Sequence, residues 1–162
     1  MTDKQKVVAL LKEALANELV SYYQYWICST ITNGLWKRAL SHQFLNQSLT
    51  EKEHAEKITK RLVELKAIPI LSPFELQNFS SIDYIKPKNT KDTHLLSQIL
   101  QRKHNNILRY NEIFEKLKYI DEISAKLILE ILQEEITQED NLEITFIHIS
   151  SKEHHNTSLL SL

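Results

Sequence analysis

The feature that most constrains this chain is the presence of a single glycine, Gly34, in 162 residues. Proteins rich in β-structure use glycine in their hairpin turns, and a chain with one glycine and three prolines supports few such turns. Long stretches without either residue favour a few uninterrupted helices instead. The length suits one domain with a single core. The sequence therefore predicts an all-α domain.

Apolar residues recur at alternating steps of three and four, which is the spacing of one buried helix face. This pattern predicts four helices, from about Lys4 to Thr32, Leu35 to Ala67, Asp92 to Leu117 and Glu122 to Ile149. On the third of them we expect the inward face to include Leu100, His104, Ile107, Leu108 and Phe114.

The segment 68–91 breaks the helical pattern and holds all three prolines. At ~3.3 Å per residue it reaches beyond the length of a ~30-residue helix. A connection of this length can return the chain to the starting end of the second helix. We therefore expect residues 1–149 to form an up-down four-helix bundle with one long crossover between helices two and three, the ferritin-like topology. Residues 150–162 then form a short fifth helix or a frayed tail.

Composition and charge exclude several classes of partner. The net charge is -1, so no overall basic field attracts nucleic acid or an anionic membrane. Cys28 is the only cysteine, which excludes an internal disulfide or a cysteine-based zinc site and favours a reducing compartment. Neither an apolar signal core nor a run of the ~18 apolar residues that span a bilayer is present. We expect a cytoplasmic protein with no nucleic-acid or membrane partner.

Charged residues interrupt the apolar stripes near the middle of three predicted helices. They are Glu18, the pair Glu51 and His54, and Glu135. A single such glutamate can turn out to water or bond to a tyrosine, but converging buried carboxylates repel one another and need a partner. A metal ion resolves this conflict, and carboxylates with an imidazole suit iron or manganese. The three-residue step from Glu51 to His54 matches the Glu-x-x-His segments of di-iron bundles.

These residues make the chain resemble the bacterioferritins, the heme-containing ferritins of bacteria, over most of its length. The segments that carry the resemblance are Asn17-Glu18-Leu19-Val20 with Gln24-Tyr25, Glu51-Lys52-Glu53-His54-Ala55, and Ile131-Leu132-Gln133-Glu134-Glu135. The resemblance implies oxidation of Fe(II) by O2 and storage of ferric mineral in a multi-subunit shell. It also implies that Glu18, Glu51, His54 and Glu135 are iron ligands and that Tyr25 is a catalytic neighbour.

The chain departs from the family pattern at several positions. Gln138 stands where the histidine of the second Glu-x-x-His belongs, and Gln101 best matches the position of the third-helix glutamate. An amide oxygen is a poor ligand for a ferric ion, so we expect one well-bound iron and a second that is weak or absent. His104 is either a replacement ligand or a packed core histidine. Lys52 stands at the place of the heme-binding methionine, so no heme is expected.

Two functions follow from these departures. The first is iron storage and detoxification of bacterioferritin type, with weak or partial oxidation of Fe(II). The second is a non-catalytic structural subunit of a ferritin-like shell, homo-oligomeric or co-assembled with an active ferritin subunit. A metal oxidase acting on an organic substrate has no recognisable substrate pocket in the sequence, and a DNA-protecting mini-ferritin would need a basic arm. His154 and His155 form either a solvated tail or a surface metal trap.

Overall fold

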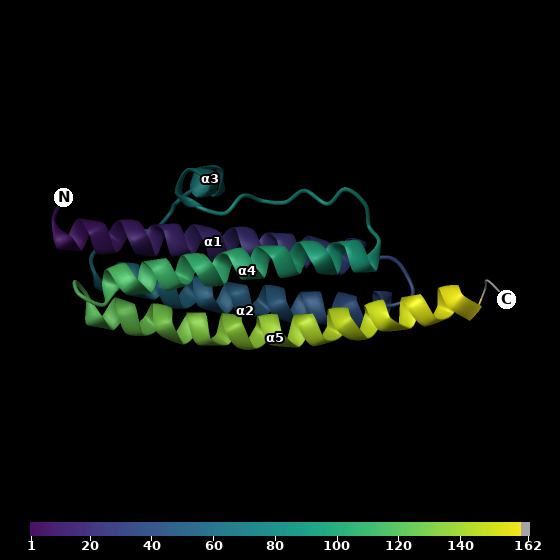
Figure 1. Ribbon diagram of the computed structural model, residues 1–162. Helices are drawn as coiled ribbons and strands as arrows, with labels where there is room; N and C mark the ends of the chain where they lie inside the picture. The colour runs from purple at the N-terminus through teal and green to yellow at the C-terminus, as the bar shows by residue number, and fades with distance from the viewer. Residues whose placement is uncertain (160–162) are drawn as a thin grey trace.

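The computed structural model describes the backbone of residues 1–159 and the side chains of residues 1–153. Its long helices lie side by side (Figure 1), with bounds α1 Asp3–Ile31, α2 Lys37–Glu64, α4 Asp92–Leu117 and α5 Glu122–Leu159. Within the described residues the only β-pairing is an isolated bridge between Asn33 and Lys91. The predicted all-α four-helix bundle is confirmed. None of the helices in this part of the chain has an apolar stretch long enough to cross a bilayer.

The segment between α2 and α4 runs along the length of the bundle, so that α2 and α4 are parallel, as predicted (Figure 1). It contains a 3-10 turn, η1 Pro73–Glu75, and a short helix, α3 Leu76–Phe79, which the sequence did not predict. The hydroxyl of Ser72 accepts a hydrogen bond from the N–H of Phe74 at 3.3 Å. Pro73 begins the turn at a position where its missing N–H has no consequence.

Arg102 of α4 fixes the crossover to the bundle. Its side chain is fully buried, and it donates hydrogen bonds to the carbonyl oxygen of Asp83 at 2.7 Å and to Ser21 Oγ at 2.8 Å. A third bond runs to the carbonyl oxygen of Asn17 at 3.3 Å. A buried guanidinium needs such acceptors because its desolvation is otherwise costly. Arg102 therefore ties α4, α1 and the crossover together.

The core consists of two apolar clusters with a layer of polar side chains between them. One cluster includes Leu11, Ile58, Ile113 and Ile128, and the other includes Phe44, Leu95, Ile99 and Leu142. Each fully buried side chain of this size stabilises the fold by roughly 1.5–3 kcal/mol. The two clusters therefore hold the helices together on either side of the layer that carries the chemistry.

The last helix is longer than its sequence pattern suggested. α5 continues without a break from Glu122 to Leu159, so residues 150–159 belong to it and do not form a separate short helix or a frayed tail. The buried side chain of Ile149 continues its apolar face to the predicted end of the bundle. The side chains of His154 and His155, and all of residues 160–162, lie outside the described residues.

Gly34 lies where the turn between α1 and α2 meets the start of α4. Its φ of +141° is rarely adopted by residues with a Cβ, and a Cβ there would lie 2.4 Å from Oδ2 of Asp92. The buried carboxylate of Asp92 accepts hydrogen bonds from the N–H groups of Trp36 at 2.7 Å and Thr93 at 2.8 Å. The absence of a side chain at residue 34 therefore lets Asp92 join this turn to α4.

We expect Gly34→Ala to lower the free energy of unfolding by about 1–3 kcal/mol, because the added Cβ strains the backbone and displaces the Asp92 carboxylate. Thermal unfolding followed by circular dichroism would show a melting temperature lower by several degrees. Leu35→Ala is the matched control, since this neighbouring side chain is 75% exposed. A Gly34→Ala protein as stable as the parent would contradict the prediction.

Candidate metal centre

Four side chains from three helices meet in the polar layer. Glu18 comes from α1, Glu51 and His54 come from α2, and Glu135 comes from α5. All four are 0% exposed, and one ligand atom of each lies within 4.8 Å of the other three. The structure thus brings together the four residues that the sequence indicated as ligands. We refer to them as the ligand cluster.

Each member of the ligand cluster has one buried atom that is unpaired within the described residues. Oε2 of each glutamate and Nδ1 of His54 are buried and make no hydrogen bond within the part of the chain that the structure describes. This Nδ1 lies 3.4 Å from Oε2 of Glu18 and 3.7 Å from Oε1 of Glu135. Buried polar atoms without partners are rare and costly. A cation among these four atoms would satisfy them all, and the donor set suits iron or manganese.

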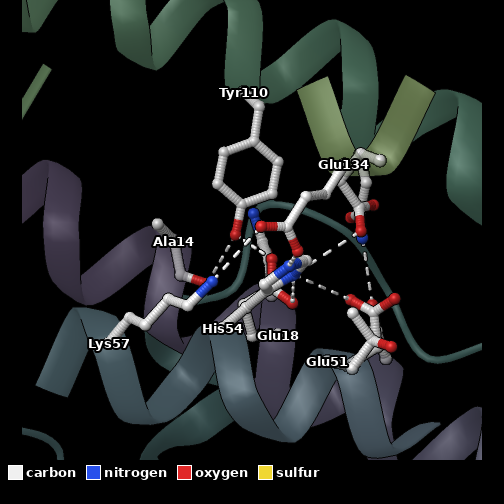
Figure 2. Close-up of polar contacts among 12 residues, drawn as sticks. Ala14, Glu18, Glu51, His54, Lys57, Tyr110 and Glu134 are labelled. Carbon is white, nitrogen blue, oxygen red and sulfur yellow. Dashed lines mark hydrogen bonds and ion pairs between the residues drawn. The ribbon is translucent and has the colours of Figure 1, made fainter. Parts of the chain in front are cut away.

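Glu134 of α5 orients the imidazole of His54 (Figure 2). Nε2 of His54 lies 2.8 Å from one carboxylate oxygen of Glu134, and Nζ of Lys57 donates to the other at 3.3 Å. Burial opposes ionisation of Glu134, but the hydrogen bonds and charges of His54 and Lys57 together outweigh burial and lower the pKa of Glu134. With the Nε2 proton directed at Glu134, Nδ1 keeps its lone pair towards the cluster, as a metal-binding histidine requires.

Tyr110 of α4 fixes Glu18 in a similar way. Its hydroxyl, which lies 3.4 Å from the carbonyl oxygen of Ala14, donates a hydrogen bond to Oε1 of Glu18 (Figure 2). Oε2 of Glu18 therefore remains free and turned towards the other ligands. Neither Tyr110 nor Glu134 could be assigned a role from the sequence, because neither is a ligand in the expected pattern and each acts only through a tertiary contact.

Lys103 of α4 is the central residue that the sequence analysis missed. Its side chain is 0% exposed, and Nζ donates to Oε1 of Glu51 at 2.5 Å, of Glu135 at 2.9 Å and of Gln138 at 2.7 Å. Burial alone would lower the pKa of Lys103, but Glu135 and Glu51 outweigh burial and raise it well above its usual value. The side chain is therefore an ammonium ion fixed beside the ligand cluster.

The remaining predicted site residues lie outside the ligand cluster. Gln101 is exposed, because two residues of helix turn it roughly 200° away from Lys103, so it does not reach the cluster as the sequence analysis expected. His104 is also on the surface, where its Nδ1 lies 3.0 Å from Glu139, and it is not a replacement ligand. Tyr25 is buried with its hydroxyl unpaired within the described residues, and its ring centroid lies 5.3 Å from Nζ of Lys103.

Burial raises the pKa values of the three glutamates of the cluster. The pKa of Glu18 rises to about 7, that of Glu51 to about 8 and that of Glu135 to about 7. Desolvation is the largest cause for all three, and repulsion from the neighbouring carboxylates adds to it. Without a metal ion, the folded cluster therefore retains protons that these groups lose near pH 4.5 in the unfolded chain.

We expect the metal-free protein to lose stability as the pH rises from about 5 to about 8. The folded state binds more protons than the unfolded state in this window, so the free energy of unfolding falls by up to ~1.4 kcal/mol per pH unit for each retained proton. Urea unfolding at several pH values measures this slope. Glu51→Gln should flatten it, whereas Glu53→Gln, at an exposed neighbouring position, should leave it unchanged. A metal-free parent that becomes more stable towards pH 8 would contradict the prediction.

Comparisons with known proteins agree with this architecture. The family model described as a ferritin-like domain matches residues 8–149. A DNA protection during starvation protein of Pyrococcus furiosus is 27% identical over 141 residues, which cover 85% of this chain and 75% of the relative. A bacterioferritin of Rhodobacter capsulatus is 25% identical over 144 residues, which cover 86% of this chain and 80% of the relative.

Among solved structures, a dodecameric thioferritin, the bacterioferritin-related protein of Bacteroides fragilis, is similar over 94% of this chain and 90% of its own. The TM-score is 0.89 and the sequence identity is 26%.

Proposed function

Because the chain belongs to the ferritin-like domain family, we propose that it is an iron storage and detoxification protein of bacterioferritin type. It binds iron at Glu18, Glu51, His54 and Glu135 and oxidises Fe(II) weakly. The observation that carries this proposal is the convergence of Glu18, Glu51, His54 and Glu135 in a fully buried layer, with one ligand atom of each within 4.8 Å of the others. Each of the four also has a buried atom that is unpaired within the described residues.

The chemistry of the cluster favours iron as the bound ion. Three carboxylates and one imidazole form a hard donor set, and their negative charge stabilises the ferric state more than the ferrous state. The protons that burial retains on Glu18 and Glu51 leave as the metal binds, because a carboxylate must ionise to act as a ligand. Tyr25, buried beside the cluster with a free hydroxyl, is the proposed catalytic neighbour.

Two features support weak rather than rapid oxidation. Gln138 offers an amide where the family pattern has a histidine, and this amide accepts a hydrogen bond from Lys103. Lys103 also binds one oxygen each of Glu51 and Glu135. Fewer strong ligands therefore remain for a second iron than in a complete two-iron site.

We place this activity in a homo-oligomeric shell in the cytoplasm. The relative from Bacteroides fragilis is described as dodecameric. Several large apolar side chains of α1 and the crossover are exposed in the single chain: Tyr23 by 49%, Trp26 by 43%, Leu71 by 79% and Phe74 by 92%. Apolar surface of this extent is typical of protein interfaces, and another copy of the chain would cover it.

The second candidate function is a non-catalytic structural subunit of such a shell, assembled alone or with an active ferritin subunit. One observation favours it: the ammonium of Lys103 already neutralises part of the charge on Glu51 and Glu135, so the layer has a cation without any metal. Iron uptake distinguishes this candidate from the first.

We expect the parent protein to bind Fe(II) without oxygen and, once O2 is admitted, to form ferric iron slowly in an assembly much larger than a monomer. Glu18→Ala and His54→Ala should weaken binding by about 100-fold or more, because each removes a ligand. Anaerobic titration, ferric absorbance and elution volume measure the three properties. Glu53→Gln is the control on α2 and should behave like the parent.

The outcomes separate the two functions. Rapid ferric formation that depends on His54 would exclude the structural subunit. Elution as a monomer without iron uptake would contradict storage, and a large assembly that never binds iron would leave only the structural subunit.

A further inference from the structure

Lys103 holds the oxygen atoms that a second metal ion in this layer would need. Its Nζ lies 2.5 Å from Glu51, 2.9 Å from Glu135 and 2.7 Å from Gln138. We propose that the ammonium of Lys103 takes the place of a second metal ion and thereby makes the ligand cluster a site for one divalent ion. This inference rests on the proposed function, because it assumes that the cluster binds metal.

The surroundings of the ammonium are complete. An ammonium has three N–H donors, and Lys103 directs one at each of three oxygen acceptors from α2 and α5. The ring of Tyr25, with its centroid 5.3 Å from Nζ, adds a favourable cation–π contact. No N–H donor of Lys103 is left without an acceptor, so specific hydrogen bonds hold this side chain in the polar layer.

Glu51 and Glu135 connect the ammonium to the metal position. Each gives Oε1 to Lys103 and keeps Oε2 buried and unpaired within the described residues. Glu51 approaches Nδ1 of His54 with Oε2, at 4.0 Å, and Glu135 approaches the same nitrogen with Oε1, at 3.7 Å. The two carboxylates thus lie between two cation positions, in the way that bridging carboxylates lie between two metal ions, with an ammonium in one of the positions.

The charges of the layer balance with one divalent ion. Three carboxylates carry three negative charges, and a metal-bound His54 is neutral. Lys103 contributes one positive charge and a divalent ion contributes two, so the buried layer is neutral. A second divalent ion would leave two uncompensated positive charges away from water, which is strongly unfavourable. Arg102 is a further buried positive charge that attracts the same three glutamates, but it makes no direct contact with them, because its hydrogen bonds go to Ser21 and to backbone carbonyl oxygens. The neutral sum therefore applies to the four ligands, Lys103 and the bound ion.

A site for one ion has a direct consequence for the chemistry of O2. Reduction of O2 to peroxide takes two electrons, whereas one Fe(II) that becomes Fe(III) supplies one. The second electron must therefore come from another chain or from a second iron that arrives after the first has left. Lys103 in this way slows the oxidation of Fe(II) at this site.

We expect the parent chain to bind one Co²⁺ and the Lys103→Glu chain to bind two. The substitution removes the fixed cation and supplies a carboxylate from α4 to the same oxygen-lined position. Calorimetric titration of the full chain with Co²⁺ counts the ions, and the visible absorbance of Co²⁺ reports their coordination. Adding Gln138→His in the Lys103→Glu background should tighten the second ion. Lys116→Glu, on the exposed side of the same helix, is the control and should bind one.

Lys103→Met provides a second test if Lys103→Glu does not fold, since it keeps an unbranched apolar stem and removes the ammonium with its charge and its three N–H donors. We expect its metal-free form to unfold at a lower temperature than the parent at about pH 8, because Glu51 and Glu135 lose their cation. Co²⁺ should then raise its melting temperature by more than it raises that of the parent. Equal melting temperatures for the two metal-free chains would overturn the inference.

The number of bound ions distinguishes a failure of this inference from a failure of the proposed function. Two ions in the parent chain, or one ion in both the parent and the Lys103→Glu chain, would overturn the role of Lys103 and leave the proposed function standing. If none of these chains binds an ion, the proposed function itself is overturned.

Discussion

The ion pairs that Lys103 forms with Glu51 and Glu135 are the interaction on which the middle of this bundle depends. Three carboxylates with 0% exposure would repel one another strongly in a layer from which water is excluded. The ammonium lies within 2.9 Å of two of them and so lets α2, α4 and α5 pack across this layer. The apolar clusters on either side of the layer supply most of the favourable free energy of folding. The ion pairs determine which polar side chains of the three helices lie opposite one another.

The residues that support the ligands on α1 and α2 come from α4 and α5. Tyr110 of α4 holds Glu18 of α1, and Glu134 of α5 holds His54 of α2. These contacts satisfy the outward atoms of the two ligands and leave the inward atoms unpaired. The cluster is therefore arranged by its neighbours before any metal ion arrives, which reduces the reorganisation that binding requires.

The sequence was sufficient for the presence of the four long helices, for the long crossover between α2 and α4, and for the meeting of the four residues of the ligand cluster. Each of these depends on the spacing of residues along the chain. It was insufficient for the orientation of α4. The face that we expected to be buried, through Leu100, His104 and Leu108, is not the face that the structure buries. The buried face includes Ile99, Lys103, Asn106, Tyr110 and Ile113, which also follow steps of three and four. Adjacent Arg102 and Lys103 are typical of a solvent-exposed turn, and only tertiary contacts with acceptors from other helices show that both are buried.

The glutamine at residue 138 supports a site for one ion rather than a two-iron site that has lost some of its ligands. Random loss of ligands would leave buried donors and acceptors unpaired around the lost metal, at a cost in stability. Here Lys103 and Gln138 complement each other, because the amide oxygen accepts the third N–H of the ammonium without adding charge. The ammonium of Lys103 is thus satisfied by protein groups, while each residue of the ligand cluster keeps a buried atom that is unpaired within the described residues. A fully paired ammonium beside unpaired ligand atoms is the arrangement expected where a single cation binds.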